Sequence, residues 1–161
     1  MADRRDQRRR QILDAAKRVF ADKGFHQASI NDIIAAAGIA RGTFYLYFPG
    51  KDAVFEAVLD EAIRDLRERI VRVDVSPGAP PPREQLEENV ARVLDYVFED
   101  RALITLLLAH GIAPDLEVAA RVEQFFGHVH EMIESSVRYG LSVGLVRPCD
   151  PTLVAAAILG A

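Results

Sequence analysis

The stretch ASINDIIAAAGIARGTFYLYFPGK, residues 28–51, decides the fold. It contains two short amphipathic segments that meet at a turn centred on Gly38, because glycine readily adopts a positive φ. Ser29 can cap the first segment, and Asp32 three residues later completes a pattern like a capping box. Two short helices joined in this way are typical of a helix-turn-helix, whose second helix enters a groove of DNA.

The second segment is predicted to be a helix from about residue 40 to residue 47. At 100° per residue, Phe44 and Phe48 fall on one face and must point to the core. Gly42 and Leu46 fall on the opposite face. Gly42 has no side chain, so the helix can approach a duplex closely, and Leu46 can touch a thymine methyl group.

The flanks of this helix carry polar groups suited to DNA. Arg41 can reach a guanine edge or a phosphate. Thr43, Tyr45 and Tyr47 have hydroxyls suited to phosphate oxygens, which position a protein without reading sequence. Lys51 is predicted in the first turn of the next helix, where the helix dipole disfavours a cation unless a phosphate lies nearby. The alternative to DNA binding is that this segment is only structural, because short Ala/Ile helices joined at a glycine are common in all-α proteins.

The charge of the chain is unevenly distributed, and this favours the DNA-binding interpretation. The net charge is −4. Residues 1–51 hold ten Lys/Arg and five Asp/Glu, a net +5, and residues 52–161 hold ten and nineteen, a net −9. A basic first third on an acidic body suits a DNA-contacting head. Five arginines at the start can reach the DNA backbone or a minor groove, although each can equally be solvated: Arg4, Arg5, Arg8, Arg9 and Arg10.

The helix-turn-helix segment and the residues before it resemble the N-terminal domain of the TetR family of bacterial repressors. The resemblance covers about the first third of the chain, and one departure is Ala40, where the family often has a serine or threonine cap worth about 1 kcal/mol. The later part of the chain carries weaker resemblances at Gly140, Gly144-Leu145-Val146-Arg147 and Asp150-Pro151. The matching positions in the first third are Ile12 to Ala16, Val19-Phe20, Gly24-Phe25, Ile33, Ala37-Gly38-Ile39 and Gly42 to Lys51.

The resemblance implies an all-α protein with a three-helix DNA-binding head, residues 1–51, and a helical ligand-binding and dimerisation body, residues 52–161. It implies a homodimer that binds a palindromic double-stranded DNA operator and releases it when a small molecule enters the body. A shift of the helix starting near Lys51 would change the separation of the two recognition helices. By position, the family's DNA contacts correspond to Ser29, Arg41, Gly42, Thr43, Tyr45, Tyr47 and Lys51.

Composition places the protein in the cytoplasm. Half of the residues are hydrophobic, which is enough for a sizeable core, and the single cysteine, Cys149, excludes an internal disulfide and fits a reducing compartment. No apolar run is long enough to span a membrane. The charged start is unlike a signal peptide.

The body is predicted to be helical, with a Pro-rich break at residues 75–82 and a second break at residues 111–114. It should enclose a mostly apolar pocket for the small-molecule effector. His110 can anchor a ligand or cap its own helix. The other candidate lining residues, each of which also fits plain core, are Phe55, Leu59, Leu94, Phe98, Leu107, Phe125, Phe126 and Val129.

No metal site and no cofactor are expected. His128 and His130 lie about 200° apart on a helix and cannot share one ion. The apolar segment at residues 152–161, which has a plausible start at Asp150, ends in mid-run. We therefore expect a further C-terminal segment of roughly 25–40 residues, the usual length of one or two helices with a loop.

The favoured function is a ligand-responsive transcription regulator, expected to be a repressor released by a small, mostly apolar molecule. One alternative is a small helical enzyme, although the chain lacks a nucleophile–base pair, a metal cluster or a phosphate-binding glycine loop. The other alternative is a constitutive DNA-binding or adaptor protein without an inducer.

Overall fold

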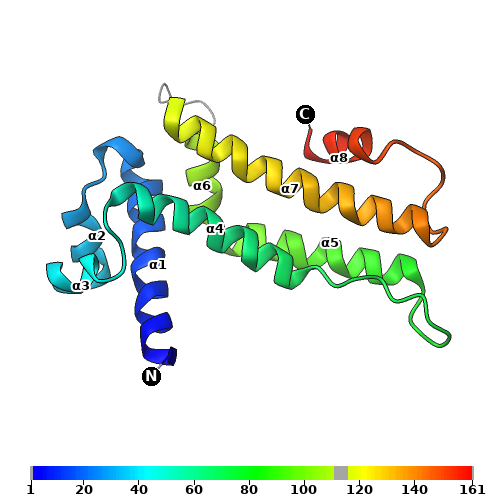
Figure 1. The fold of residues 1–161 in the computed structure, drawn as a ribbon, viewed down its shortest axis with the longest axis horizontal. Helices are drawn as coiled ribbons and strands as arrows, with labels where there is room; N and C mark the ends of the chain where they lie inside the picture. Colours follow the sequence, from blue (N-terminus) through cyan, green and yellow to red (C-terminus); the bar gives the residue numbers. More distant parts are fainter. Residues whose placement is uncertain (1, 111–115, 161) are drawn as a thin grey trace. The chain divides into compact units, whose positions relative to one another are not determined.

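The computed structural model describes residues 2–110 and 116–160, and within these ranges it is all-helical, as predicted (Figure 1). The described chain divides into two compact units: Met1–Ala62 with Asp100–Glu123, called unit 1, and Ile63–Glu99 with Gln124–Ala161, called unit 2. The helices are α1 (Ala2–Gln27), α2 (Ile30–Ala37), α3 (Arg41–Tyr45), α4 (Lys51–Arg69), α5 (Pro82–Glu99), α6 (Arg101–His110), α7 (Leu116–Ser142) and α8 (Pro151–Leu159).

Unit 1 is built around an aromatic core. Phe20 and Phe25 of α1 and Phe55 of α4 are buried, and their ring centroids lie 5.0 to 5.6 Å apart. Gly24, with φ 74°, interrupts the helical backbone of α1 and turns the chain so that Phe25 reaches this core. Aromatic pairs at these separations add to the free energy of burial by about 1 kcal/mol each.

Helix α6 is tied to α1 by an ion pair within unit 1. The Lys17 ammonium of α1 donates to one carboxylate oxygen of Asp100. The other oxygen accepts from the backbone N–H of Leu103 at 3.0 Å, so Asp100 also caps the start of α6. At the start of α7, Arg121 pairs with Asp52 of α4 at 3.1 Å. The compact unit that contains the predicted DNA-binding segment therefore extends beyond residue 51.

Unit 2 contains the end of α4, α5, most of α7 and α8. After α4 the chain is non-helical until Pro82, which agrees with the predicted break at residues 75–82. Two amide side chains of α5 hold this segment through its backbone. Asn89 accepts from the N–H of Val71 at 2.9 Å and donates to its carbonyl at 2.6 Å. Gln85 makes the same pair of bonds with Asp74, both at 2.8 Å.

Helix α8 begins at Pro151, and Asp150 caps it at the predicted start: the Asp150 carboxylate accepts from the N–H of Thr152 at 2.9 Å. It lies beside α7 (Figure 1), and the Thr152 hydroxyl donates to Glu134 at 2.6 Å. Leu153 and Ile158 are exposed by 71% and 63%. Helix α8 therefore presents apolar side chains to solvent.

Across the described ranges, no helix combines the length and the apolar character that crossing a bilayer requires.

Candidate nucleic-acid interface

The first helix of the predicted helix-turn-helix begins at a complete capping box. The Ser29 hydroxyl accepts from the backbone N–H of Asp32 at 3.1 Å, and the Asp32 carboxylate accepts from the backbone N–H of Ser29 at 2.9 Å. Lys23 of α1 donates to the same carboxylate at 2.7 Å. The Lys23 ammonium and then the Ser29 hydroxyl hold the pKa of Asp32 well below its usual range. The predicted cap is confirmed, and α1 reinforces it.

The turn after α2 is made by Gly38, which adopts φ 62° and ψ 39°. Its N–H donates to the Ala35 carbonyl at 3.2 Å, which closes the helix end as predicted. The carbonyl of Ala37, just before the turn, accepts from the side-chain amide of Gln11 at 2.7 Å. Gln11 lies on α1 and was not singled out from the sequence, because nothing in local spacing relates it to residue 37.

Helix α3 is shorter than predicted, since it spans Arg41–Tyr45 while residues 46 and 47 form a turn. Ala40 provides no side-chain cap at its start. The predicted facing is confirmed. Phe44 is fully buried and Phe48 nearly so, whereas Leu46 is 76% exposed. A short helix is thus held on the unit 1 core by one aromatic face and presents the opposite face to solvent.

Arg41 is already oriented by two neighbours on this exposed face. Its guanidinium donates to the Asn31 side-chain carbonyl at 3.3 Å and lies 5.8 Å from the ring centre of Tyr45. Asn31 belongs to α2, and the sequence patterns did not point to it. Both contacts are exposed and weak, so the guanidinium can exchange them for a guanine edge or a phosphate at little cost.

Lys51 has protein partners in place of the phosphate that its position suggested. Its ammonium donates to the carbonyls of Phe25 at 2.7 Å and Ala28 at 3.0 Å. It also lies 4.3 Å from the ring centre of Phe25. The conflict with the α4 dipole is therefore relieved by carbonyl oxygens, and Lys51 fastens the start of α4 to the α1–α2 connection. A phosphate contact by Lys51 stays a prediction.

The remaining predicted DNA contacts lie on α3 and in the turn that follows it. Gly42 and Tyr45 are exposed, and Thr43 and Tyr47 are half-buried. A Cβ added at Gly42 would meet nothing within 4 Å beyond the adjoining backbone of its own helix, so the space in front of the helix is open at this position. Arg9 of α1 lies 5.4 Å from the ring centre of Phe48, which places one of the N-terminal arginines against the segment that follows α3.

The predicted effector-binding residues are divided between the two units. Phe55, Leu59 and Leu107 lie in unit 1, where all three are buried, and Phe55 belongs to the aromatic core. The side chain of His110 lies outside the described residues. The other five lie in unit 2, where Leu94, Phe98 and Phe126 are exposed, Val129 is half-buried and Phe125 is buried. Their role in binding an effector stays a prediction.

Comparison with known proteins consistently finds bacterial regulatory proteins. The family profile described as "Bacterial regulatory proteins, tetR family" matches residues 12–58. The HTH-type transcriptional regulator UidR of Escherichia coli K12 is 26% identical over 155 residues, which cover 94% of this chain and 75% of UidR. The structure of the fatty acid degradation regulator FadR from Bacillus halodurans superposes with a TM-score of 0.78 at 26% identity, covering 93% of this chain and 80% of that one.

The extent of the match varies among the relatives. The chain spans 47% of the length of YerO, an HTH-type transcriptional regulator of Bacillus subtilis, at 25% identity over 138 residues that make up 86% of this chain. The matched relatives are named as transcriptional regulators.

Proposed function

This chain belongs to the TetR family of bacterial regulatory proteins, and we propose that it regulates transcription as a homodimer on a palindromic DNA operator. In this proposal the protein represses and is released by a small, mostly apolar molecule. It acts in the cytoplasm, where the operator is, and it has no catalytic role. Ser29, Arg41, Gly42, Thr43, Tyr45, Tyr47 and Lys51 are the proposed DNA-contacting residues.

The exposed face of α3 is the observation that carries this proposal. Phe44 anchors the helix in the core, and Arg41 and Tyr45 stand on its outer side beside the open position at Gly42. The major groove of DNA, about 12 Å wide, admits an α-helix, so the exposed side of α3 can enter it. The net charge of +5 on residues 1–51 supplies the attraction to phosphates.

Helix α4 is the element through which release would operate. It starts at Lys51, beside the DNA-binding segment, and continues without a break into unit 2. Two recognition helices can occupy successive major grooves only when their separation matches about one helical turn of DNA. A ligand that binds more tightly to the state with the wrong separation therefore lowers operator affinity.

The test is operator binding by the purified protein, measured by fluorescence anisotropy with DNA from upstream of its own gene. We expect affinity that falls steeply with salt. Arg41→Ala should cost about 1–3 kcal/mol on the preferred sequence and relax the base preference, whereas Tyr47→Phe should weaken all sequences alike. Arg83→Ala, an exposed arginine of α5, is the matched control and should change nothing.

The proposal fails if the wild-type protein shows no salt-sensitive affinity for any duplex. It also fails in its contact map if Arg41→Ala and Arg83→Ala bind equally well. The effector part is tested separately, by adding apolar compounds to the preformed complex and measuring release.

A further inference from the structure

Unit 2 contains a groove between the end of α4 and the second half of α7. Two adjoining cavities of about 460 and 430 Å³ make up this α4–α7 groove. They share Ile70, Ser135 and Ser136, so they are continuous along one side of α7. Each has the volume of a site for a small molecule but is open to solvent on one side. None of the residues predicted from the sequence to bind the effector lines either cavity.

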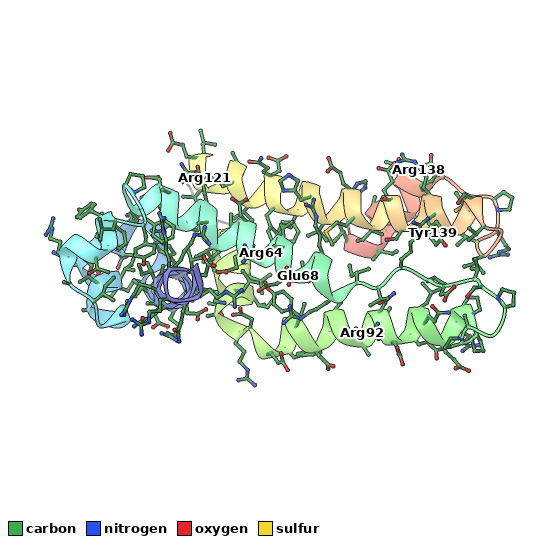
Figure 2. All side chains as sticks on the ribbon, turned by 60° about the horizontal axis from the view of Figure 1, so that its bottom comes forward. Arg64, Glu68, Arg92, Arg121, Arg138 and Tyr139 are labelled. Carbon is green, nitrogen blue, oxygen red and sulfur yellow. The ribbon has the colours of Figure 1, made fainter. Side chains whose placement is uncertain are left out.

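The wall of the groove opposite α7 is formed in advance. It consists of the extended segment after α4, and the side-chain amide of Asn89 holds that segment at Val71. From α7, the Tyr139 hydroxyl donates to the Val73 carbonyl at 3.1 Å. Figure 2 shows Tyr139 on α7, and the guanidinium of Arg72 lies 4.0 Å from its ring centre. Because this wall is already ordered, the segment after α4 loses little further conformational entropy when a ligand binds.

The second cavity has a mostly apolar lining. Ile70, Val73 and Leu86 contribute from the α4 and α5 side. Leu145 and Val146 close the end, and Val146 lies so near Gly140 that a Cβ at residue 140 would be 2.6 Å from its methyl group. A hydrocarbon chain would be stabilised here because its apolar surface is removed from water.

The first cavity supplies polar groups that are not committed elsewhere. Within the described residues, the Arg67 guanidinium and the Ser135 hydroxyl make no hydrogen bond or ion pair to protein; both residues are exposed, so a ligand carboxylate would replace water there. By contrast, the Asn89 amide and the Tyr139 hydroxyl are already bound to the backbone of the wall. Two arginines, Arg67 and Arg72, and one carboxylate, Glu131, line the combined groove, which leaves it with a net charge of +1.

We propose that the α4–α7 groove binds an amphipathic organic carboxylate. The carboxylate accepts hydrogen bonds from Arg67 and Ser135, and the apolar chain extends past Ile70 toward Val146. The inference rests on the proposed function, because it assigns this groove as the site of the effector. Arg67 lies near the end of α4, the helix that starts at the DNA-binding segment, and Ile70 directly follows that helix, so a ligand that contacts both residues acts on this helix end.

The experiment uses the full chain and decanoate as the probe, with decanol as its uncharged counterpart. Isothermal titration calorimetry should give one decanoate site per chain and about fivefold weaker binding of decanol, because a partly exposed charge-assisted hydrogen bond is worth this much. Arg67→Gln should abolish the preference for decanoate over decanol. Ser135→Trp should block both ligands. The matched controls, Arg101→Gln and Gln124→Trp, change exposed residues outside the groove and should behave as wild type.

The outcomes separate this inference from the proposed function. Decanoate binding that is unchanged by Arg67→Gln and by Ser135→Trp overturns the groove assignment, as does the absence of any decanoate binding by a protein that binds its operator. Decanoate that binds in the groove without lowering operator affinity overturns the effector role. Failure to bind any duplex instead overturns the proposed function itself. Circular dichroism melts of every variant establish that the comparison is between folded proteins.

Discussion

Replacing Lys51 with methionine separates a structural role from a DNA contact. Methionine keeps the apolar stem but removes the ammonium, which donates to the Phe25 and Ala28 carbonyls and lies over the Phe25 ring. The substitution removes these two hydrogen bonds at about 1 kcal/mol each and a cation–π interaction at about 0.5–1 kcal/mol. A third hydrogen bond, to the His26 carbonyl, is 3.4 Å long and contributes little. Removing a cation from the first turn of α4 returns about 0.5 kcal/mol. The expected decrease in the free energy of unfolding is therefore about 2 kcal/mol.

Urea unfolding followed by circular dichroism measures this decrease as a lower midpoint with an unchanged m value. DNA binding is then measured at a low temperature at which both proteins are folded. If Lys51 also neutralises a phosphate, the slope of log K against log salt becomes smaller by about 0.9 in the Lys51→Met protein. Lys23→Met is the control, since its ion pair with Asp32 is exposed and is worth less than about 1 kcal/mol.

A decrease in stability below about 0.5 kcal/mol would refute the structural role assigned to the carbonyl hydrogen bonds. An unchanged salt slope together with an unchanged affinity would show that Lys51 does not bind DNA. The two results are independent, because one is measured without DNA and the other on folded protein.

Local geometry gives the remaining predictions. Gly38→Ala should destabilise the protein by about 1–2 kcal/mol because residue 38 has a left-handed backbone. Gly42→Ala should leave thermal stability unchanged or higher, since its methyl group faces open space. The same methyl group should weaken duplex binding because it stands where the helix approaches the DNA. Ser29→Ala should cost about 1 kcal/mol in chemical unfolding at pH 7. Because the pKa of Asp32 is lowered in the folded state, the wild-type protein should be more stable than Asp32→Asn by a constant amount above the unfolded pKa of about 3.9. This difference should shrink as the pH falls below that value. A difference that stays constant down to about pH 2 would contradict the prediction. Asn89→Leu should lower the free energy of unfolding by about 1 kcal/mol, with Asn89→Asp intermediate because it keeps only the acceptor for the Val71 N–H.

The DNA-binding segment could be predicted from the sequence because its signals are local. Ser29 and Asp32 are three residues apart, Gly38 directly follows its helix, and the facing of Phe44 depends only on helical spacing. Each of these interactions is completed within one or two turns of helix, so no knowledge of the remaining chain is required. The length of α3 was overestimated because the first stop signal after Tyr45 in the sequence is Pro49-Gly50, and nothing before it indicates the earlier end that the structure shows.

Contacts between distant parts of the chain could not be predicted in this way. Gln11 meets the Ala37 carbonyl 26 residues away, and Lys17 meets Asp100 across 83 residues. The effector candidates illustrate the same limit. Apolar periodicity suggested that all of them face inward, but Leu94, Phe98 and Phe126 are exposed, and periodicity does not show which residues surround a cavity.

The amino-acid sequence by itself determined the helices, the basic character of the first 51 residues and the side of α3 that is exposed, because periodicity, capping and charge act over a few residues. Only the tertiary structure decided where Lys51 directs its ammonium, which elements join the DNA-binding helices in unit 1, and that α4 and α7 leave a groove between them. These features depend on how helices far apart in the chain pack together, and packing is a property of the whole set of side chains rather than of any one segment.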